Sequence, residues 1–327
     1  MHDDTIPPLP KELKEPSTRE TMLYLLYALA LAYAPGLLAS TVADLPVPLI
    51  VRMVAIACLT VVAAYGFFVL GTSGHEGFHF NLHRSRYVSA ATGAFFSSVV
   101  PLFFAVGFFA IHWQHHRYTN TDKDPDVHSL QRFRTFLSRG LLGRLAFNRR
   151  YLGWTLSILR GDPVNNAPLS AGEFRFLAWV NVAAQIFWLA VHAVLIVVAP
   201  KTMIFVLALP LVVMLFISGL NPYLEHAGTE LNRATNARTR SSMILTLLTA
   251  GVNYHLEHHL YPNVPVWRLA RVHRWLKKEG WFENRTTFIE PSFWKSFRYA
   301  AASTPYSISA NGVYPPSARA AHTGSTP

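Results

Sequence analysis

Cysteine is almost absent from this sequence: Cys58 is the only one among 327 residues. A single thiol excludes an intrachain disulfide, an iron–sulfur cluster held by cysteines of one chain, and zinc sites built on CxxC pairs. It also leaves the redox compartment of the protein undetermined. If the protein binds a metal, other side chains must supply the ligands.

Charge is scarce as well, and acidic charge most of all. Asp, Glu, Lys and Arg make up 14% of the chain, against about 25% in a typical soluble domain, whereas hydrophobic residues reach 51%. This deficit predicts that much of the surface faces lipid. The formal net charge is +11, but no nucleic-acid motif accompanies it, so we expect the basic segments to lie against anionic lipid head groups and expect no nucleic-acid partner.

Four long apolar runs are almost free of charge. Each has about 19 residues or more, which is enough for a helix to cross the ~30 Å hydrocarbon core of a bilayer. They predict transmembrane helices at about 21–39, 53–71, 176–199 and 202–220. Pro35 and Pro210 lie inside these runs, where membrane helices tolerate proline if neighbouring groups satisfy the freed backbone.

A fifth apolar stretch, 88–111, contains Gly93, Pro101 and Gly107. Histidines lie both before and after it, and a shared metal site would need both groups on one side of the membrane. We therefore predict a re-entrant hairpin or an interfacial helix pair here, not a single crossing. Downstream, residues 266–278 have the pattern of an amphipathic helix, with basic and apolar residues at helical spacing.

The distribution of basic residues predicts the orientation. With a cytoplasmic N-terminus, the outer loops 40–52 and 200–201 contain only Arg52 and Lys201, so 27 of the 29 Lys and Arg fall on the cytoplasmic side. The polar, acidic start of the chain does not have the pattern of a cleavable signal peptide. We expect a bacterial inner-membrane protein with both termini in the cytoplasm.

The predicted fold is therefore an all-α integral membrane protein with a cytoplasmic helical cap. Residues 1–20 are expected to form an N-terminal cytoplasmic tail, mobile up to about residue 16, and 21–302 a single membrane domain. The Ser- and Pro-containing segment 303–327 is expected to be a mobile tail.

Fifteen histidines are the anomaly in the composition, and most fall in three motifs: HEGFH at 75–79, HWQHH at 112–116 and HLEHH at 255–259. Helical positions i, i+3 and i+4 share one face, so each motif can present its imidazoles in one direction. Eight histidines exceed the three or four that one zinc ion takes, which predicts a two-metal site. The candidate ligands are His75, His79, His112, His115, His116, His255, His258 and His259.

His226 follows the fourth predicted span on the same side of the membrane, and we include it as a ninth candidate ligand because a two-metal site has positions left to fill. His83 is a weaker candidate for an additional ligand. His192 lies alone in the third span and is expected to be a packed or hydrogen-bonded core residue. We expect surface positions for the rest, which are His2, His128, His273 and His322.

Carboxylates beside the histidines are candidates for orienting them, since a ligating imidazole usually donates its other N–H to a carboxylate or carbonyl. The candidates are Glu76, Glu225, Glu257, Asp122 and Asp126. The two aspartates belong to the acidic segment 121–126, TDKDPD, which also contains Asp124 and could equally be a solvated turn.

These motifs resemble those of the membrane fatty acid desaturase superfamily, which includes acyl-lipid desaturases, hydroxylases and carotenoid ketolases. HEGFH, HWQHH and HLEHH occur in the order that the superfamily shows, and HHRYTNTDKDPD (115–126) continues the second motif. The resemblance covers about 75–262 and the preceding pair of spans. It implies four transmembrane helices, a cytoplasmic catalytic cap and a non-haem di-iron centre with the eight motif histidines as ligands, and His226 matches an extra histidine that many members carry.

The resemblance also implies the chemistry. A di-iron enzyme of this kind uses dioxygen and two electrons to oxidise an unactivated C–H bond of a lipid, and fatty acyl desaturation is the activity that we expect first. No cytochrome-like or cysteine-rich electron carrier is recognisable in the chain, so the donor is expected to be a separate protein such as a ferredoxin or a cytochrome. The basic cytoplasmic face suits an acidic donor.

Several alternatives remain at this stage. A hydroxylase or ketolase of a carotenoid, alkane or other lipid would share these motifs, with Tyr87, Phe95, Phe96, Phe103 and Phe104 either lining an apolar tunnel or simply packing. Spacing alone also permits zinc, manganese or copper. A zinc-dependent lipid hydrolase would need a carboxylate base such as Glu76 or Glu257. A metal transporter would place its ligands within the spans, near the midplane of the membrane.

Overall fold

Helices form nearly all of the regular structure in a computed structural model of the chain, which confirms the all-α prediction. The structure describes residues 6–126, 131–165, 167–283, 285, 287–292, 294–295, 297–301, 307–309 and 312–314. The strands within these ranges form two small sheets, a parallel pair of β1 (Arg238–Thr239) with β2 (Phe288–Ile289) and an antiparallel pair of β3 (Ser307–Ser309) with β4 (Gly312–Tyr314).

The four predicted spans are confirmed as helices long and apolar enough to cross a membrane. Three are continuous: α2 (Thr18–Val42), α3 (Leu49–Phe78) and α8 (Ala171–Val198). The fourth consists of α9 (Pro200–Met203), a π-helical turn η1 (Ile204–Ala208) and α10 (Leu209–His226). Pro210 lacks the N–H that a regular helix needs at that position, and the wider turn directly before α10 accommodates this break.

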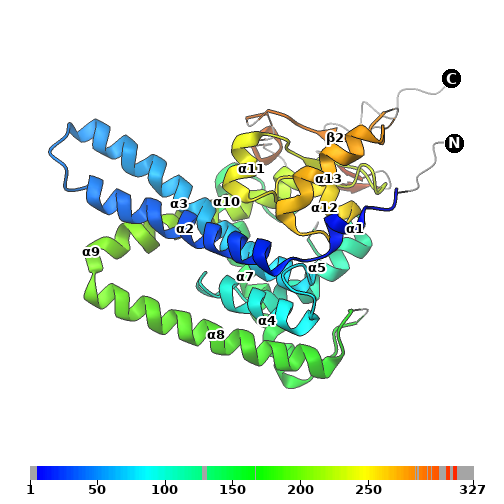
Figure 1. Cartoon of the computed structure of the whole chain (residues 1–327), viewed down its shortest axis with the longest axis horizontal. Helices are drawn as coiled ribbons and strands as arrows, with labels where there is room; N and C mark the ends of the chain where they lie inside the picture. The colour runs from blue at the N-terminus through cyan, green and yellow to red at the C-terminus, as the bar shows by residue number, and fades with distance from the viewer. Residues whose placement is uncertain are drawn as a thin grey trace.

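The spanning helices extend as two hairpins from one side of a compact helical body (Figure 1). In the first hairpin α2 lies against α3, and a Cβ placed on Gly66 would come 2.1 Å from the backbone nitrogen of Ala32. Only a residue without a side chain allows this approach. At the far end of the hairpins, Lys201 of α9 forms an exposed ion pair with Asp44 in the turn that follows α2.

The segment 88–111 lies in two helices, α4 (Arg86–Ser97) and α5 (Ala105–Tyr118), and the bend between them. The bend between them is held by α8: the side-chain amide of Gln185 donates to the carbonyl oxygens of Val100 and Phe103, and its oxygen accepts from Leu102 N–H. The chain thereby returns to the body that contains the end of α3.

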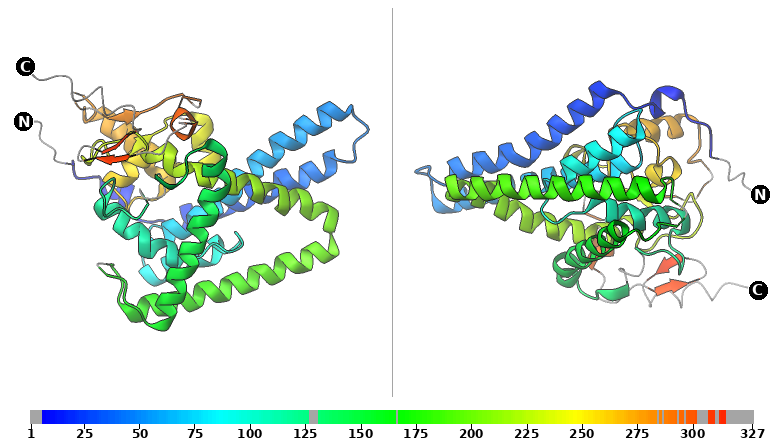
Figure 2. Two further views of the ribbon diagram at one scale, coloured as in Figure 1. Left: turned by 180° about the vertical axis from the view of Figure 1, so that it is seen from behind. Right: turned by 90° about the horizontal axis from the view of Figure 1, so that it is seen from below.

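Helix α7 (Phe136–Arg160) crosses the direction of α8 steeply (Figure 2). It packs closely on α10, because a Cβ on Gly219 would lie 2.4 Å from the carbonyl oxygens of Arg139 and Gly140. The opposite face of α7 exposes a row of leucines, namely Leu137, Leu141, Leu145, Leu152 and Leu156. One side of this helix is thus suited to lipid and the other to the protein core.

Short helices complete the body: α1 (Lys11–Lys14), α11 (Met243–Thr249), α12 (His255–Leu260), α13 (Val266–Lys278) and α14 (Phe297–Ala301). Helix α13 matches the predicted amphipathic segment. One of its basic residues departs from the expected pattern, because Arg268 is buried and donates to the Glu20 carboxylate. Its guanidinium is satisfied by the N-terminal region and does not face solvent.

The N-terminal region corrects a second expectation. Residues 6–16, predicted to be mobile, pack on α13 and its neighbours: Leu9 is buried, and the carbonyl oxygens of Glu12 and Glu15 accept from Arg268. At the other end, most of the predicted tail 303–327 lies outside the described residues. The part that is described pairs as β3 and β4 and has regular structure.

Candidate metal centre

The candidate ligands lie where the helices meet the body. His75 occupies the last turn of α3, His79 caps that helix, and His226 is the final residue of α10. The HWQHH motif ends α5, and the HLEHH motif begins α12. Four segments far apart in the sequence therefore bring their histidines to one place in the body.

Five of these histidines form a first group, and their donor nitrogens all lie within 4.8 Å of one another: His75, His79, His112, His116 and His258. The Nε2 atom of His258 lies 3.0 Å from that of His75 and 2.9 Å from that of His116. The Nε2 atoms of His116 and His112 are 3.0 Å apart.

The other four form a second group of the same kind: His115, His226, His255 and His259. The Nε2 atom of His255 lies 2.9 Å from that of His226 and 3.1 Å from that of His259. The Nε2 atoms of His115 and His259 are 3.3 Å apart. All four side chains are buried, and the structure thus brings the ninth candidate, His226, together with the motif histidines.

These separations are compatible with a metal ion held between the rings of each group. A metal–nitrogen bond of about 2.1 Å puts neighbouring ligands of one ion about 3.0 Å apart at a right angle and about 3.4 Å apart at the tetrahedral angle. The observed distances fall in or next to that range. In addition, the His79 ring is buried and neither of its nitrogens has a hydrogen-bond partner among the described residues. A metal bond would satisfy that ring.

The protonation states also suit metal binding, because the neutral imidazole is the ligand form. Burial, with the other imidazoles close by, lowers the pKa of His79, His112, His116 and the three HLEHH histidines well below the ordinary value. His115 differs. Burial alone would lower its pKa, but the Asp124 carboxylate beside it raises the pKa to about 9, so binding a metal through Nε2 would release a proton.

Carboxylates orient two of the rings directly. Glu76 lies 2.7 Å from Nδ1 of His75, and its other oxygen accepts from Val266 N–H at 2.9 Å. Both oxygens of Asp124 lie 2.9 Å from Nδ1 of His115. Each carboxylate therefore fixes which ring nitrogen carries the proton and leaves Nε2 facing its group.

In the acidic segment 121–126, the aspartate that contacts a histidine directly is not one of the two that the sequence predicted. Asp122 is exposed, and no contact joins it to the nine histidines, whereas Asp124 is buried against His115. Asp126, the other predicted residue, lies 3.9 Å from Nδ1 of His115. A backbone hydrogen bond fixes the turn, since Asp124 also accepts from Asn120 N–H. Of the three aspartates, Asp124 is therefore the one in hydrogen-bond contact with His115.

The predicted glutamates Glu225 and Glu257 differ in whether they lie near the nine histidines. An oxygen of Glu225 lies 3.5 Å from Nδ1 of His255. Glu257 contacts none of the nine histidines directly. Instead it pairs with Nδ1 of His273 at 2.5 Å and accepts from the Thr239 hydroxyl. His273 is consequently half-buried against α12 and not the surface residue that was expected.

Sequence reasoning missed two further partners of the rings. The carbonyl oxygen of Asn236 lies 2.9 Å from Nδ1 of His226, and the Thr119 hydroxyl lies 3.4 Å from Nδ1 of His259. Every residue has a backbone carbonyl, so the identity of residue 236 could not indicate this contact. Thr119 lies three residues after the end of the second motif, and this proximity is the signal that could have identified it.

The remaining histidines lie outside the two groups. His83 belongs to neither, and its Nδ1 accepts from Ser85 N–H. His192 is buried in α8 with its Nε2 3.4 Å from the Tyr33 hydroxyl, in agreement with the predicted core role. His2, His128 and His322 lie outside the described residues.

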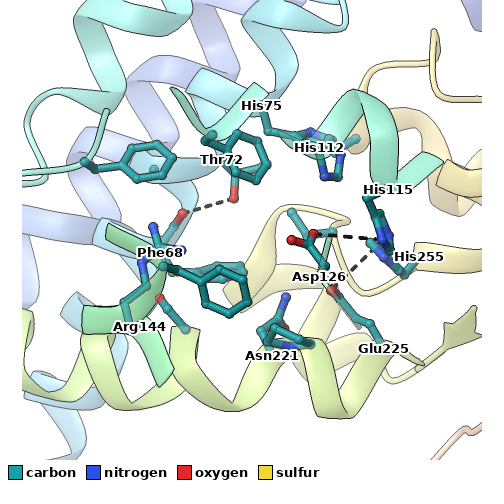
Figure 3. A pocket seen from close by; sticks show the side chains of 18 of the residues that line it. Phe68, Thr72, His75, His112, His115, Asp126, Arg144, Asn221, Glu225 and His255 are labelled. Atoms are coloured by element: carbon teal, nitrogen blue, oxygen red, sulfur yellow. Dashed lines mark hydrogen bonds and ion pairs between the residues drawn. The ribbon is translucent and has the colours of Figure 1, made fainter. Parts of the chain in front are cut away.

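A cavity opens onto the histidines. Figure 3 shows His75, His112, His115 and His255 along its wall, with Phe68 and Arg144 at the opposite end. Much of the remaining lining is apolar and comes from α3, α5, α7, α10 and the bend between α4 and α5, including Phe67, Val100, Phe103, Phe108, Phe147 and Met214. Of the five aromatic residues considered for a tunnel, Phe103 lines this cavity and the other four do not. The arrangement can hold an apolar chain beside two metal-binding groups.

Comparison with known proteins gives two matches. The profile of the fatty acid desaturase family matches residues 50–288, a stretch that includes all nine histidines. The beta-carotene ketolase of Paracoccus sp. (strain PC1) is 31% identical over 170 residues. That alignment covers 50% of this chain and 57% of the ketolase, so the chain spans little more than half the length of this relative.

Proposed function

Because this chain belongs to the fatty acid desaturase family, we propose that it is an integral membrane oxidoreductase that uses dioxygen to oxidise C–H bonds of a lipid at a di-iron centre. One observation carries the proposal: nine histidines form two metal-sized groups at the wall of an apolar cavity, next to the ends of membrane-spanning helices. Fatty acyl desaturation is the reaction that we propose first.

In this proposal the two groups each hold one iron. The first group supplies His75, His79, His112, His116 and His258, and the second supplies His115, His226, His255 and His259. Glu76 and Asp124 keep a proton on Nδ1 of His75 and His115, so that Nε2 remains free to bind. Imidazole ligands suit iron as well as zinc or copper, and the choice of iron rests on the family.

The chemistry that bound iron supplies is the activation of dioxygen. For desaturation the balance is that two electrons from a donor and two from the substrate, together with four protons, reduce one dioxygen to two waters, while adjacent methylenes become an alkene. The apolar wall includes Phe68 and Phe103. In this proposal it would limit the access of water to the chain and hold one carbon–carbon bond beside the histidines. Positioning within about an ångström decides which bond reacts.

The proposal also covers the substrate, the electron donor and the orientation of the protein in the membrane. The substrate is a fatty acyl chain or a similar lipid that enters from the bilayer, and the two electrons come from a separate donor such as a ferredoxin or a cytochrome. We place the body of the protein in the cytoplasm of a bacterium, with the Lys201–Asp44 end of the helical hairpins outside. The distribution of Lys and Arg along the sequence supports this orientation.

A second function is favoured by one specific observation, the similarity to a beta-carotene ketolase. A ketolase or hydroxylase would use the same histidine groups and the same apolar cavity but insert oxygen into the substrate. Hydroxylation adds one oxygen atom, and ketone formation replaces two hydrogens with one oxygen. The product therefore distinguishes these reactions from desaturation.

The test is metal content together with oxygen-dependent product analysis on detergent-purified protein, with a lipid extract and a ferredoxin reducing system. We expect about two irons per chain, as the two groups indicate, loss of iron in His115→Ala and His258→Ala, and a product lighter by two hydrogens. A product that has gained an oxygen atom moves the assignment to hydroxylase or ketolase. Zinc in place of iron, with turnover independent of oxygen, would overturn the oxidase proposal and favour a hydrolase.

A further inference from the structure

Arg144 lies half-buried at the cavity wall, and it differs from the buried arginines because no described residue accepts a hydrogen bond from it. Its Nε atom is buried without a hydrogen-bond partner, and its guanidinium lies over two aromatic rings, 4.8 Å from the centroid of Phe103 and 5.7 Å from that of Tyr151. The side chain as a whole is half-buried. Cation–π contacts replace only part of the hydration that a guanidinium loses when it is taken out of water.

The buried arginines with structural roles have a different environment. Arg139 donates to the carbonyl oxygens of Phe133 and Ala300, and Arg238 donates to those of Leu224 and Ala227. Arg268 binds the Glu20 carboxylate, as described above. In each case the protein supplies the oxygen atoms that a buried guanidinium needs. At Arg144 it supplies aromatic faces and an open cavity.

Among the described residues that line the cavity, none supplies a counter-ion at that end. The two carboxylates among them lie near the histidines, with Asp126 3.9 Å from His115 and Glu225 3.5 Å from His255. Figure 3 shows Arg144 beside Phe68, across the cavity from His115 and His255. The donor groups of Arg144 therefore remain available to whatever fills the space between the two ends.

We propose that Arg144 binds an oxygen atom of the lipid substrate, so that the cavity selects a chain with a carboxylate or carbonyl group at one end while its reacting carbons lie beside the histidines. This inference rests on the proposed function and deepens it. A charge-assisted hydrogen bond in a cavity with few competing waters is strong. A pure hydrocarbon such as β-carotene offers no acceptor and would leave the cation unpaired, so acyl substrates are preferred over carotenes.

The experiment is equilibrium binding of three radiolabelled probes to the full-length, iron-loaded protein in detergent: octadecanoic acid, methyl octadecanoate and octadecane. We expect Arg144→Met to weaken binding of the acid about 10- to 100-fold, the effect of losing one hydrogen bond to a charged group. Octadecane binding should not change. An equal loss for the methyl ester identifies a carbonyl as the recognised group, and a loss confined to the acid identifies a free carboxylate.

A matched control and a folding control separate a specific loss of binding from a general effect of the substitution on the structure. Arg149 is exposed on the same helix, so Arg149→Met should leave all three affinities unchanged. Because Arg144 has no acceptor to lose, Arg144→Met should retain the thermal unfolding midpoint and the iron content of the parent protein. Unchanged affinity for the acid and the ester, or an equal loss for all three probes with a lower midpoint, would overturn the proposal.

Binding is measured without turnover, so the inference and the proposed function can fail separately. If the probes bind as expected but no oxygen-dependent product forms, the oxidase proposal fails and the role of Arg144 stands. If Arg144→Met converts acyl chains and hydrocarbons as the parent protein does, the oxidase proposal stands and this inference fails.

Discussion

His226 and His83 are histidines outside the three motifs, and their side chains lie in different environments. His226 has its Nδ1 against a backbone carbonyl and its Nε2 2.9 Å from that of His255. His83 lies outside both groups. One histidine therefore lies inside a group and the other outside both groups, so alanine variants of the two can be compared directly.

We expect His226→Ala to lower the iron content from about two per chain toward one, because the second group would keep only three of its histidines. His83→Ala should retain the parent iron content. Elemental analysis of the purified variants provides the measurement. Two irons in His226→Ala, or a loss in His83→Ala, would contradict this assignment.

Asp124 and Asp122 form a second matched pair at the residue scale. Asp124→Asn should reduce metal affinity about 10- to 100-fold, as is typical when a group that orients a ligating histidine is lost. Asp122→Asn should have no effect, because that side chain is exposed. Competition with a chelator of known affinity measures both variants, and equal affinities for the two would argue against the role of Asp124.

Residue patterns identified the nine histidines but not all of their supporting contacts. The spacing of the motifs and the apolar runs was sufficient to place His226 with the others. Choosing Asp124 over Asp122 required the path of the turn after α5, which local backbone hydrogen bonds determine. The pairing of Glu257 with His273 joins two helices and cannot be derived from the spacing of either residue.

At the scale of elements, the contact of α7 with α10 joins the cavity wall to the metal centre. Gly219 allows this contact, and α10 ends seven residues later at His226. Gly219→Ala should destabilise the protein by about 1–3 kcal/mol, the usual cost of overpacking. Thermal unfolding in detergent should show a lower midpoint.

Gly153 on α7 provides the control, because nothing lies within 4 Å of a Cβ placed there. Gly153→Ala should leave the midpoint unchanged or raise it, since alanine favours a helix over glycine by up to about 1 kcal/mol. If both substitutions shift the midpoint in the same direction, close packing at Gly219 is not the cause.

The helices themselves were largely predictable, since long apolar runs and the amphipathic pattern of 266–278 depend on local sequence. The predictions that proved wrong involve contacts between distant segments. Helical spacing places Arg268 on the same basic face as Arg271 and Arg274, but Glu20, almost 250 positions earlier, binds it. The same contacts order the N-terminal residues that composition alone suggested were mobile.

At the scale of the whole molecule, the helical hairpins end on one side and α13 lies on the other (Figure 1). In a Cys58→Ser background, single cysteines at Asp44 and at Glu279 should therefore react with a membrane-impermeant thiol reagent from opposite sides of the membrane. Both positions are exposed. Labelling of both from the same side of intact cells would show that the proposed orientation is wrong.

The division of the histidines between the two groups has a consequence for biosynthesis. Four members of the first group precede residue 117, whereas the second group has only His115 until α10 is made and stays half complete until α12 follows. A chain leaving the ribosome therefore carries nearly all of one metal-binding group long before the other exists. Loading of the two positions would proceed in a fixed order, and a chain truncated before α12 would retain at most the first position, held by four of its five histidines.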